Sequence, residues 1–173
     1  MNAIDKKVLE LNARFVPAVV GFCLKEDQIL MGLRKKVSMN LGENLIAGIG
    51  GKVGDEEAFK NETHEEAMIR EAEEEIGIKI TGMTQIGRIR HINVPEKSHY
   101  NMDITVFLIE EWEGEPVETD VIKPIWFHKD ELPFERMWEA YQFWIPKVLA
   151  GKNVNALFLH QLDSKIIFSH FEE

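Results

Sequence analysis

Residues 62–78 read ETHEEAMIREAEEEIGI. Within this stretch, Thr63 and Glu66 have the spacing of a capping box, in which each side chain accepts a hydrogen bond from the other residue's backbone N–H. Gly77 is typical of the left-handed residue that follows the last turn of a helix. The sequence therefore predicts a helix over residues 64–76, with a signal at both of its ends.

The predicted helix has an apolar side and an acidic side. At 100° per residue, its apolar side chains share one stripe and three glutamates share a neighbouring face. The stripe consists of Met68, Ile69, Ala72 and Ile76, and the acidic face consists of Glu71, Glu74 and Glu75. Like charges at this spacing repel one another, and a hard cation that prefers oxygen ligands, such as Mg²⁺ or Mn²⁺, would relieve the repulsion. For a glutamate-rich helix taken alone, a solvated acidic face is the alternative.

Residues 70–78 match the second half of the Nudix box, Arg-Glu-U-x-Glu-Glu-x-Gly-U, where U is an aliphatic or small residue. Glu62 also lies the expected eight residues before Arg70. The chain therefore resembles the Nudix hydrolases. This resemblance implies an α+β fold, an α/β/α sandwich with a mixed central sheet. It also implies a divalent-metal-dependent hydrolase that cuts a diphosphate linkage in a nucleoside diphosphate derivative.

The resemblance assigns roles to individual residues. The catalytic set is Glu71, Glu74, Glu75 and Arg70, the metal set is Glu71, Glu74, Glu75 and Gly51, and the glycine loop is Gly50, Gly51 and Lys52. Glu74 and Glu75 are expected to bind Mg²⁺, with Mn²⁺ as the other candidate. Glu71 is expected to be a ligand or the general base, and Arg70 to hold the glutamates in place. Glu62 matches the outer acidic residue of the family.

The glycine loop departs from the family pattern in length. The family has five residues between the glycine and the first glutamate, whereas ten residues separate Gly51 from Glu62. The additional segment lies within residues 54–60.

Length and charge narrow the function classes. The chain has 173 residues and a formal net charge of −10, which argues against binding to nucleic-acid polymers or anionic membranes. The expected organisation is an N-terminal extension over residues 1–14 and a single domain over residues 15–173. One cysteine, Cys23, excludes an intramolecular disulfide. The N-terminus lacks the apolar core of a signal peptide and no apolar run reaches membrane-spanning length, so the expected location is cytoplasmic. The expected oligomeric state is a monomer or homodimer.

The remaining elements follow from periodicity. Strands are expected near residues 15–24, 28–33, 45–49, 78–93, 101–112, 122–127, 154–159 and 165–171. Residues 3–14 predict a polar helix that docks through Val8 and Leu11. A second helix is expected from Phe134 to Gly151, with an interruption at Pro146. His91 and His99 lack zinc-ligand spacing and are expected to be exposed loop residues.

Two charged segments are candidates for contact with the substrate. The basic cluster Arg34-Lys35-Lys36 follows a predicted strand, and it is either a solvated strand end or a set of cations that face the phosphates, together with Lys52. The acidic loop over residues 114–120 contains Glu118 and Asp120.

The rest of the chain resembles one branch of the family, the oxidised-purine nucleoside triphosphate diphosphatases. The similar segments are Leu30–Lys36, Pro116–Asp120, Trp126–Phe127, Leu132–Phe134, Met137–Trp138, Trp144 and Pro146. In that branch, the tryptophan that matches Trp138 stacks on the base; a core tryptophan is the alternative. The loop acid of the branch falls on Val121, which leaves Glu118 or Asp120 as substitutes.

The polar residues that read the base in that branch are replaced here. Its paired aspartates fall on Ala140 and Tyr141, and its asparagine before the glycine loop falls on Ala47. Strong selection between bases needs hydrogen bonds that go unpaired with the wrong base, so weak discrimination is expected.

These observations predict hydrolysis of a (deoxy)nucleoside triphosphate, including an oxidised purine such as 8-oxo-dGTP, to the monophosphate and pyrophosphate. The attacking group would be a metal-activated water. A nucleotide-sugar or dinucleoside-polyphosphate pyrophosphatase is the alternative within the same class, and a nucleotide-sensing module that binds without cutting is the alternative outside it.

Overall fold

The computed structural model describes residues 1–35, 44–163 and 165–172. Its helices are α1 (Ala3–Glu10), α2 (His64–Ile76) and α3 (Tyr141–Leu149), with short 3₁₀ segments η1 (Glu57–Phe59), η2 (Pro95–Tyr100) and η3 (Phe134–Arg136). Its strands are β1 (Val16–Lys25), β2 (Gln28–Arg34), β3 (Ile46–Ala47), β4 (Lys79–Ile92), β5 (Met102–Glu113), β6 (Ile122–His128), β7 (Val154–His160) and β8 (Ile166–Glu172).

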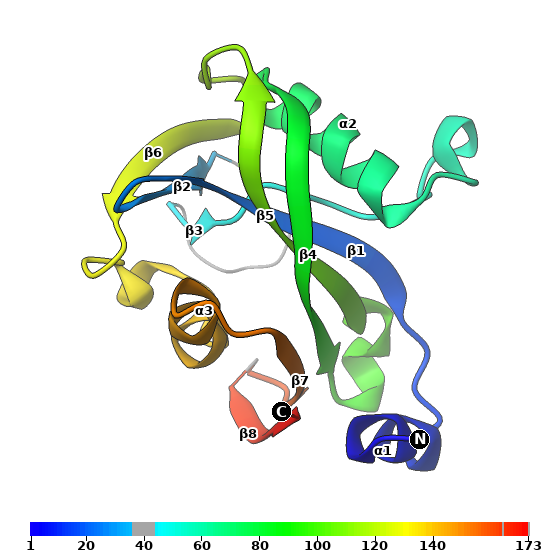
Figure 1. The fold of residues 1–173 in the computed structure, drawn as a ribbon. Helices are drawn as coiled ribbons and strands as arrows, with labels where there is room; N and C mark the ends of the chain where they lie inside the picture. Colours follow the sequence, from blue (N-terminus) through cyan, green and yellow to red (C-terminus); the bar gives the residue numbers. More distant parts are fainter. Residues whose placement is uncertain (36–43, 164, 173) are drawn as a thin grey trace.

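The strands of the described residues form one mixed sheet. Its order is β3-β2-β1-β5-β4-β7-β8, and β6 pairs with β2. The pairs β1–β5 and β4–β7 are parallel, and the other pairs are antiparallel. Helices α2 and α3 lie on opposite sides of this sheet (Figure 1). The expected α+β sandwich with a mixed central sheet is therefore confirmed.

Two apolar clusters fill the space between the sheet and these helices. On one side, Met68 and Ile76 of α2 pack with Phe107 of β5. On the other side, Trp144 of α3 packs with Phe22 of β1. Because each strand alternates its side chains between the two faces, the same strands supply both clusters. No helix in the described part of the chain is long and apolar enough to span a membrane.

Helix α2 has the predicted ends. Thr63 and Glu66 form both bonds of the capping box, and Gly77 adopts φ 72° and ψ 19°. The apolar stripe differs at one position, because Ile69 is 36% exposed while Ala67 is fully buried. The helix is rotated so that the stripe is centred on Met68 and Ala72.

The second helix begins later than predicted. Met137 has extended backbone angles, φ −116° and ψ 171°, and it forms a parallel bridge with Ile46. Its side chain is buried in the cluster on the α3 side of the sheet. This pairing takes the chain out of helical conformation, so only η3 forms near Phe134 and α3 starts at Tyr141.

The N-terminal helix is also shorter than predicted and docks through another residue. Ile4 is fully buried, whereas Leu11 is 43% exposed. The Ile4 backbone N–H donates to Glu172 Oε1 at 2.8 Å, and Asp5 pairs with buried Arg90 at 2.7 Å. Helix α1 is thereby fastened to β4 and β8.

Candidate active site

Arg70, near the middle of α2, is the centre of a hydrogen-bonded carboxylate network. Its Nε and Nη2 donate to both oxygens of Glu62, at 2.9 and 2.7 Å. Its Nη1 donates to Glu71 Oε1 at 2.9 Å and to Glu74 Oε2 at 3.1 Å. Its Nη2 also donates to the backbone carbonyl of Lys52 at 3.2 Å. A guanidinium has five N–H groups, and all five of those on Arg70 are used.

Glu62 joins this network to the start of the additional segment that follows the glycine loop. Its side chain is 8% exposed, and its Oε1 also accepts a hydrogen bond from the Gly54 backbone N–H at 2.9 Å. Hydrogen bonding from Arg70 lowers the pKa of Glu62, and the same bond raises the pKa of Arg70. The pair therefore stays charged and fixes the outer edge of the site.

Glu75 pairs with a different arginine. Its side chain is 7% exposed, and Arg34 Nη1 donates to its Oε1 at 2.9 Å. Its Oε2 accepts from the Gly50 backbone N–H at 2.9 Å, and Arg34 Nη2 donates to the Gly50 carbonyl at 3.2 Å. Burial raises the pKa of Glu75, while the Arg34 charge and the Gly50 hydrogen bond act to lower it. Arg34, β2 and the glycine loop thus hold Glu75 at the inner edge of the site.

Glu71 lies between these two arginine groups. Its side chain is 13% exposed. Burial raises its pKa, the hydrogen bond from Arg70 opposes that shift, and the nearby charges of Glu75 and Glu74 raise it further. A methyl group at residue 51 would collide with the Glu71 carboxylate, so a larger residue there would displace that carboxylate. The carboxylate consequently approaches the backbone of the loop closely.

The oxygen atoms of this site suit a hard divalent cation. Among residues 1–35, 44–163 and 165–172, no three acidic, histidine or cysteine side chains already converge as a metal cage. However, no described residue donates to Glu71 Oε2 or to Glu74 Oε1, whereas both oxygens of Glu75 are engaged. Gly51 contributes a carbonyl that accepts from Val19 N at 2.9 Å. The available ligands are all oxygens, which Mg²⁺ and Mn²⁺ prefer.

The basic and acidic segments meet beside α2. Lys35 pairs with Glu118 at 2.7 Å, which lowers the pKa of that exposed carboxyl. Thr119 Oγ1 donates to the backbone carbonyl of Glu75 at 2.9 Å, so this loop is fastened to the end of α2. Lys52 and Asp120 are exposed. Lys36 lies outside the described residues.

The α3 side of the sheet is aromatic at the positions expected to face a base. Trp138 is partly buried and packs against the apolar cluster there. Ala47 and Ala140 are buried, and the Tyr141 hydroxyl accepts from the Gly48 backbone N–H at 3.3 Å. Burial raises the pKa of Tyr141. One acceptor position of the hydroxyl oxygen is therefore used within the protein.

The prediction that His91 is an exposed loop residue is wrong. It belongs to β4, where its Nδ1 lies 2.8 Å from His160 Nε2 and its ring stacks on Phe158 with centroids 5.4 Å apart. Burial lowers the pKa of His91 to about 3, and the neighbouring His160 lowers it in addition. His99 is exposed, as expected.

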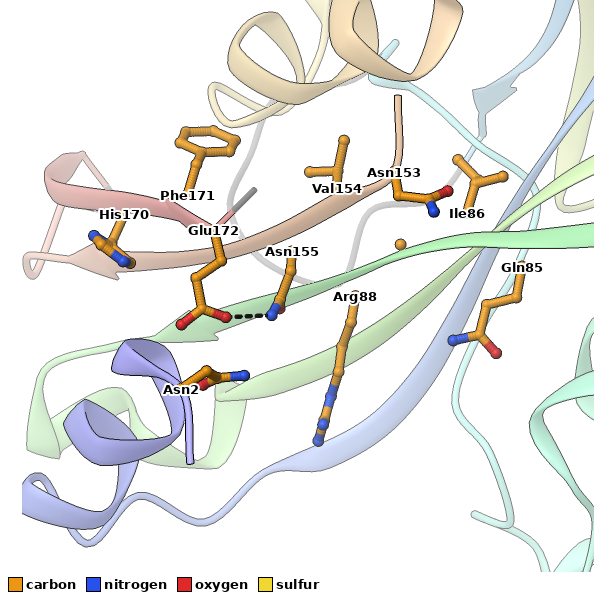
Figure 2. A pocket seen from close by; sticks show the side chains of 11 residues that line it. Asn2, Gln85, Ile86, Arg88, Asn153, Val154, Asn155, His170, Phe171 and Glu172 are labelled. Carbon is orange, nitrogen blue, oxygen red and sulfur yellow. Dashed lines mark hydrogen bonds between the residues drawn. The ribbon is translucent and has the colours of Figure 1, made fainter. Parts of the chain in front are cut away.

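A cavity of about 840 Å³ opens elsewhere, between α1, β4, β7 and β8 (Figure 2). Its polar lining includes Arg88 and Asn155, and Asn155 donates to Glu172. Arg88 is already paired with both oxygens of Asp103. None of the predicted site residues lines this cavity.

Sequence reasoning missed three features of the site. One is the pairing of Arg34 with Glu75, which depends on residues 41 positions apart. Another is the bond from Gly48 to Tyr141. The third is Phe59, whose ring lies 4.6 Å from the Arg70 guanidinium carbon. The available signal for Phe59 was an aromatic residue within an otherwise polar additional segment.

Comparisons with known proteins converge on one family. The NUDIX domain model matches residues 14–148. A Danio rerio protein named "Oxidized purine nucleoside triphosphate hydrolase" is 32% identical over 150 residues, which cover 87% of this chain and 90% of that protein. A Proteus vulgaris protein named "8-oxo-dGTP diphosphatase" is 38% identical over 115 residues, 66% of this chain and 88% of that protein.

Solved structures share the fold. The MutT protein from Bacillus halodurans superposes with a TM-score of 0.73 at 22% identity, covering 91% of this chain and 98% of that chain. The MutT NUDIX hydrolase from Burkholderia pseudomallei gives a TM-score of 0.64 at 26% identity, covering 78% and 98%.

Proposed function

Because the chain belongs to the Nudix family, we propose that it hydrolyses (deoxy)nucleoside triphosphates, including oxidised purine forms, to the monophosphate and pyrophosphate. The relatives named for oxidised purine nucleoside triphosphates and for 8-oxo-dGTP support this substrate class. Trp138 and the loop residues Glu118 and Asp120 are our candidates for substrate contact.

One observation supports the residue roles above all others. Arg70 donates four of its five N–H groups to Glu62, Glu71 and Glu74 and the fifth to the backbone carbonyl of Lys52 in the glycine loop. An ordinary solvated acidic face has no need of such an arrangement, since surface carboxylates are hydrated by water. Charge-assisted bonds of this kind hold catalytic carboxylates in a narrow range of positions.

The metal set of the proposal is Glu71, Glu74 and Glu75 with the Gly51 carbonyl. When bound there, Mg²⁺ supplies charge neutralisation on the phosphate oxygens and activation of the attacking water, and Mn²⁺ is the other candidate. Glu71 and Glu74 each keep one oxygen to which no described residue donates, which suits them to this role.

The protein side of the reaction is positioning and proton transfer. Arg70 orients the outer carboxylates, and Arg34 orients Glu75 and the carbonyl of Gly50. Glu71 acts as a ligand or as the base that takes the water proton at Oε2. Lys35 and Lys52 are the cations proposed to meet the phosphates.

Nucleotide sugars and dinucleoside polyphosphates form a second candidate substrate class. Ala47 and Ala140 are buried and apolar, and the Tyr141 hydroxyl is engaged with Gly48. These positions therefore offer few hydrogen bonds for a specific base, which favours a site that reads mainly the diphosphate.

A substrate panel tests the proposal. Purified protein with Mg²⁺ is incubated with dGTP, 8-oxo-dGTP, a nucleotide sugar and a dinucleoside polyphosphate, and the products are separated by anion-exchange chromatography. We expect monophosphate and pyrophosphate in equal amounts from the triphosphates, and no product when the metal is chelated. Turnover of the nucleotide sugar alone would replace the first substrate class with the second.

A further inference from the structure

The additional segment after the glycine loop forms a closed loop beside α2. It begins at Gly54, whose N–H is bound by Glu62 Oε1. It turns through η1, where the Phe59 N–H donates to the Glu56 carbonyl at 2.9 Å and the Glu62 N–H donates to the Phe59 carbonyl at 2.8 Å. The loop is therefore fastened at both ends to the residue that binds Arg70.

Phe59 is the residue of this loop that turns inward. Residues 55–58, 60 and 61 are exposed, whereas Phe59 is partly buried. Its ring lies 4.6 Å from the Arg70 guanidinium carbon. The hydrogen bonds of a guanidinium lie in its plane, and all five are already made, so only the faces of the group remain for further contact. The guanidinium carbon lies over the phenyl ring, which is an attractive cation–π arrangement.

This contact completes the confinement of Arg70. Hydrogen bonds to Glu62, Glu71 and Glu74 fix the rotation of the guanidinium in its plane, and the Phe59 ring restricts tilting out of it. A hollow of about 450 Å³ next to this ring is lined by the loop together with Glu66 and Arg70. Removing the ring would open Arg70 to water from this side and weaken its hydrogen bonds.

We propose that Phe59 is a positioning residue for hydrolysis, which holds the plane of Arg70 and through it the carboxylates of Glu71 and Glu74. The additional segment is thus part of the catalytic apparatus and not a surface insertion. This inference rests on the proposed function, because it assigns to Phe59 a role in the same site.

Three substitutions separate the aromatic contact from simple packing. Phe59→Tyr keeps the ring, Phe59→Leu keeps apolar bulk but removes the π face, and Phe59→Ala removes both. Phe168→Leu is the matched control, because Phe168 is an exposed aromatic residue on β8, 43% accessible. Each protein is assayed for kcat and KM with dGTP, for Mn²⁺ affinity by electron paramagnetic resonance, and for thermal stability in chelator.

We expect Phe59→Leu and Phe59→Ala to lower kcat by about tenfold with KM within about twofold, because misplaced catalytic groups lose rate and not ground-state binding. Mn²⁺ should also bind about tenfold more weakly, at the lower end of the loss expected when residues that orient metal ligands are changed. Phe59→Tyr and Phe168→Leu should match the unmodified protein.

Two results would overturn the inference. One is unchanged kcat and Mn²⁺ affinity in Phe59→Leu, and the other is an equal loss in Phe59→Tyr and Phe59→Leu together with lower thermal stability. The Mn²⁺ measurement does not depend on the substrate. If the unmodified protein cleaves no triphosphate, the proposed substrate fails, while the binding data still decide the role of Phe59.

Discussion

The two sides of the sheet bury different kinds of side chain, charged on the α2 side and mainly aromatic on the α3 side. On the α2 side, buried carboxylates are paired with Arg70 and Arg34. On the α3 side, the Tyr141 hydroxyl accepts from the Gly48 backbone N–H, whereas the buried Trp144 Nε1 has no hydrogen-bond partner among the described residues. The first side presents charge that can act on a diphosphate, while the second presents mainly flat apolar surface. From this difference we expect an enzyme that depends strongly on its charged residues for diphosphate cleavage and that discriminates only weakly between bases.

The largest expected effect is on the α2 side. Glu74→Gln should lower kcat by on the order of a hundredfold or more, because it removes a proposed metal ligand. Its thermal stability should be unchanged or higher, since the Glu74 side chain is 52% exposed and an exposed ion pair contributes only about 0–1 kcal/mol. Steady-state kinetics at saturating Mg²⁺ and thermal denaturation check both parts.

Glu73→Gln is the control for that variant, because Glu73 is an exposed neighbour on the same helix. It makes the same charge change and should keep full activity. Full activity in Glu74→Gln would remove Glu74 from the metal set.

The next effect is on the α3 side. If Trp138 stacks on the base, Trp138→Ala should lower kcat/KM by about thirtyfold, mainly through KM, with little loss of stability. Trp112→Ala serves as the control, because Trp112 is a partly buried tryptophan on the α2 side that stacks on Trp126. It should lose stability without a change in KM. A loss of about 3–5 kcal/mol of stability in Trp138→Ala would instead make Trp138 a core residue.

A third effect concerns pH and the His91–His160 pair on the α3 side. Because the pKa of folded His91 is lowered to about 3, the unfolded chain binds a proton that the folded chain does not, once the pH falls below about 6.5. This contribution to stability is complete above that pH and is lost as the pH falls towards 3, by up to about 1.4 kcal/mol per pH unit. The free energy of unfolding should therefore fall less steeply with acid in His91→Gln than in the unmodified protein. Urea titrations between pH 7 and pH 4.5 measure the slopes, and the exposed residue His99 supplies the control His99→Gln, which should leave the slope unchanged.

The smallest expected effect is the preference between bases. The kcat/KM for 8-oxo-dGTP should differ from that for dGTP by only a few-fold, at most about tenfold, because apolar contact rejects a wrong group weakly. Ala47 and Ala140 have no polar side-chain group at positions used by the branch that the chain resembles, and the Tyr141 hydroxyl already accepts a bond from Gly48. A preference of several orders of magnitude for the oxidised base would show that other residues, such as Asn44 or Gln142, read it.

The sequence predicted best where structure depends on neighbouring residues. The ends of α2 were correct because Thr63 and Glu66 cap the helix across three positions and Gly77 ends it. Most strand positions were correct to within one or two residues, because alternation is a local pattern. Prediction was poorer where distant residues intervene. The bridge between Ile46 and Met137 makes α3 begin later in the chain than predicted. His91, predicted to be an exposed loop residue, lies on β4 beside His160.

The candidate site divides along the same line. The spacing along the chain already indicated that Arg70, Glu71 and Glu74 of α2 could meet Glu62, which lies just before that helix. The structure brings these residues together. Arg34 was expected to belong either to a solvated strand end or to a set of cations that face the phosphates, and the structure places its guanidinium on Glu75 and the Gly50 carbonyl. Nothing local connects β2 with the end of α2, so this pairing depended on the sheet.

By itself, the sequence determined the helix that carries the carboxylates through short-range periodicity, and the family through fixed motif spacing; the resemblance to that family then implied the mixed α+β fold. The tertiary structure alone decided which arginine holds which glutamate, that the Tyr141 hydroxyl accepts from Gly48, and that the Arg70 guanidinium lies over the ring of Phe59. The reason is physical: hydrogen bonds and ring contacts of these kinds act over a few ångströms in space, whatever the separation along the chain.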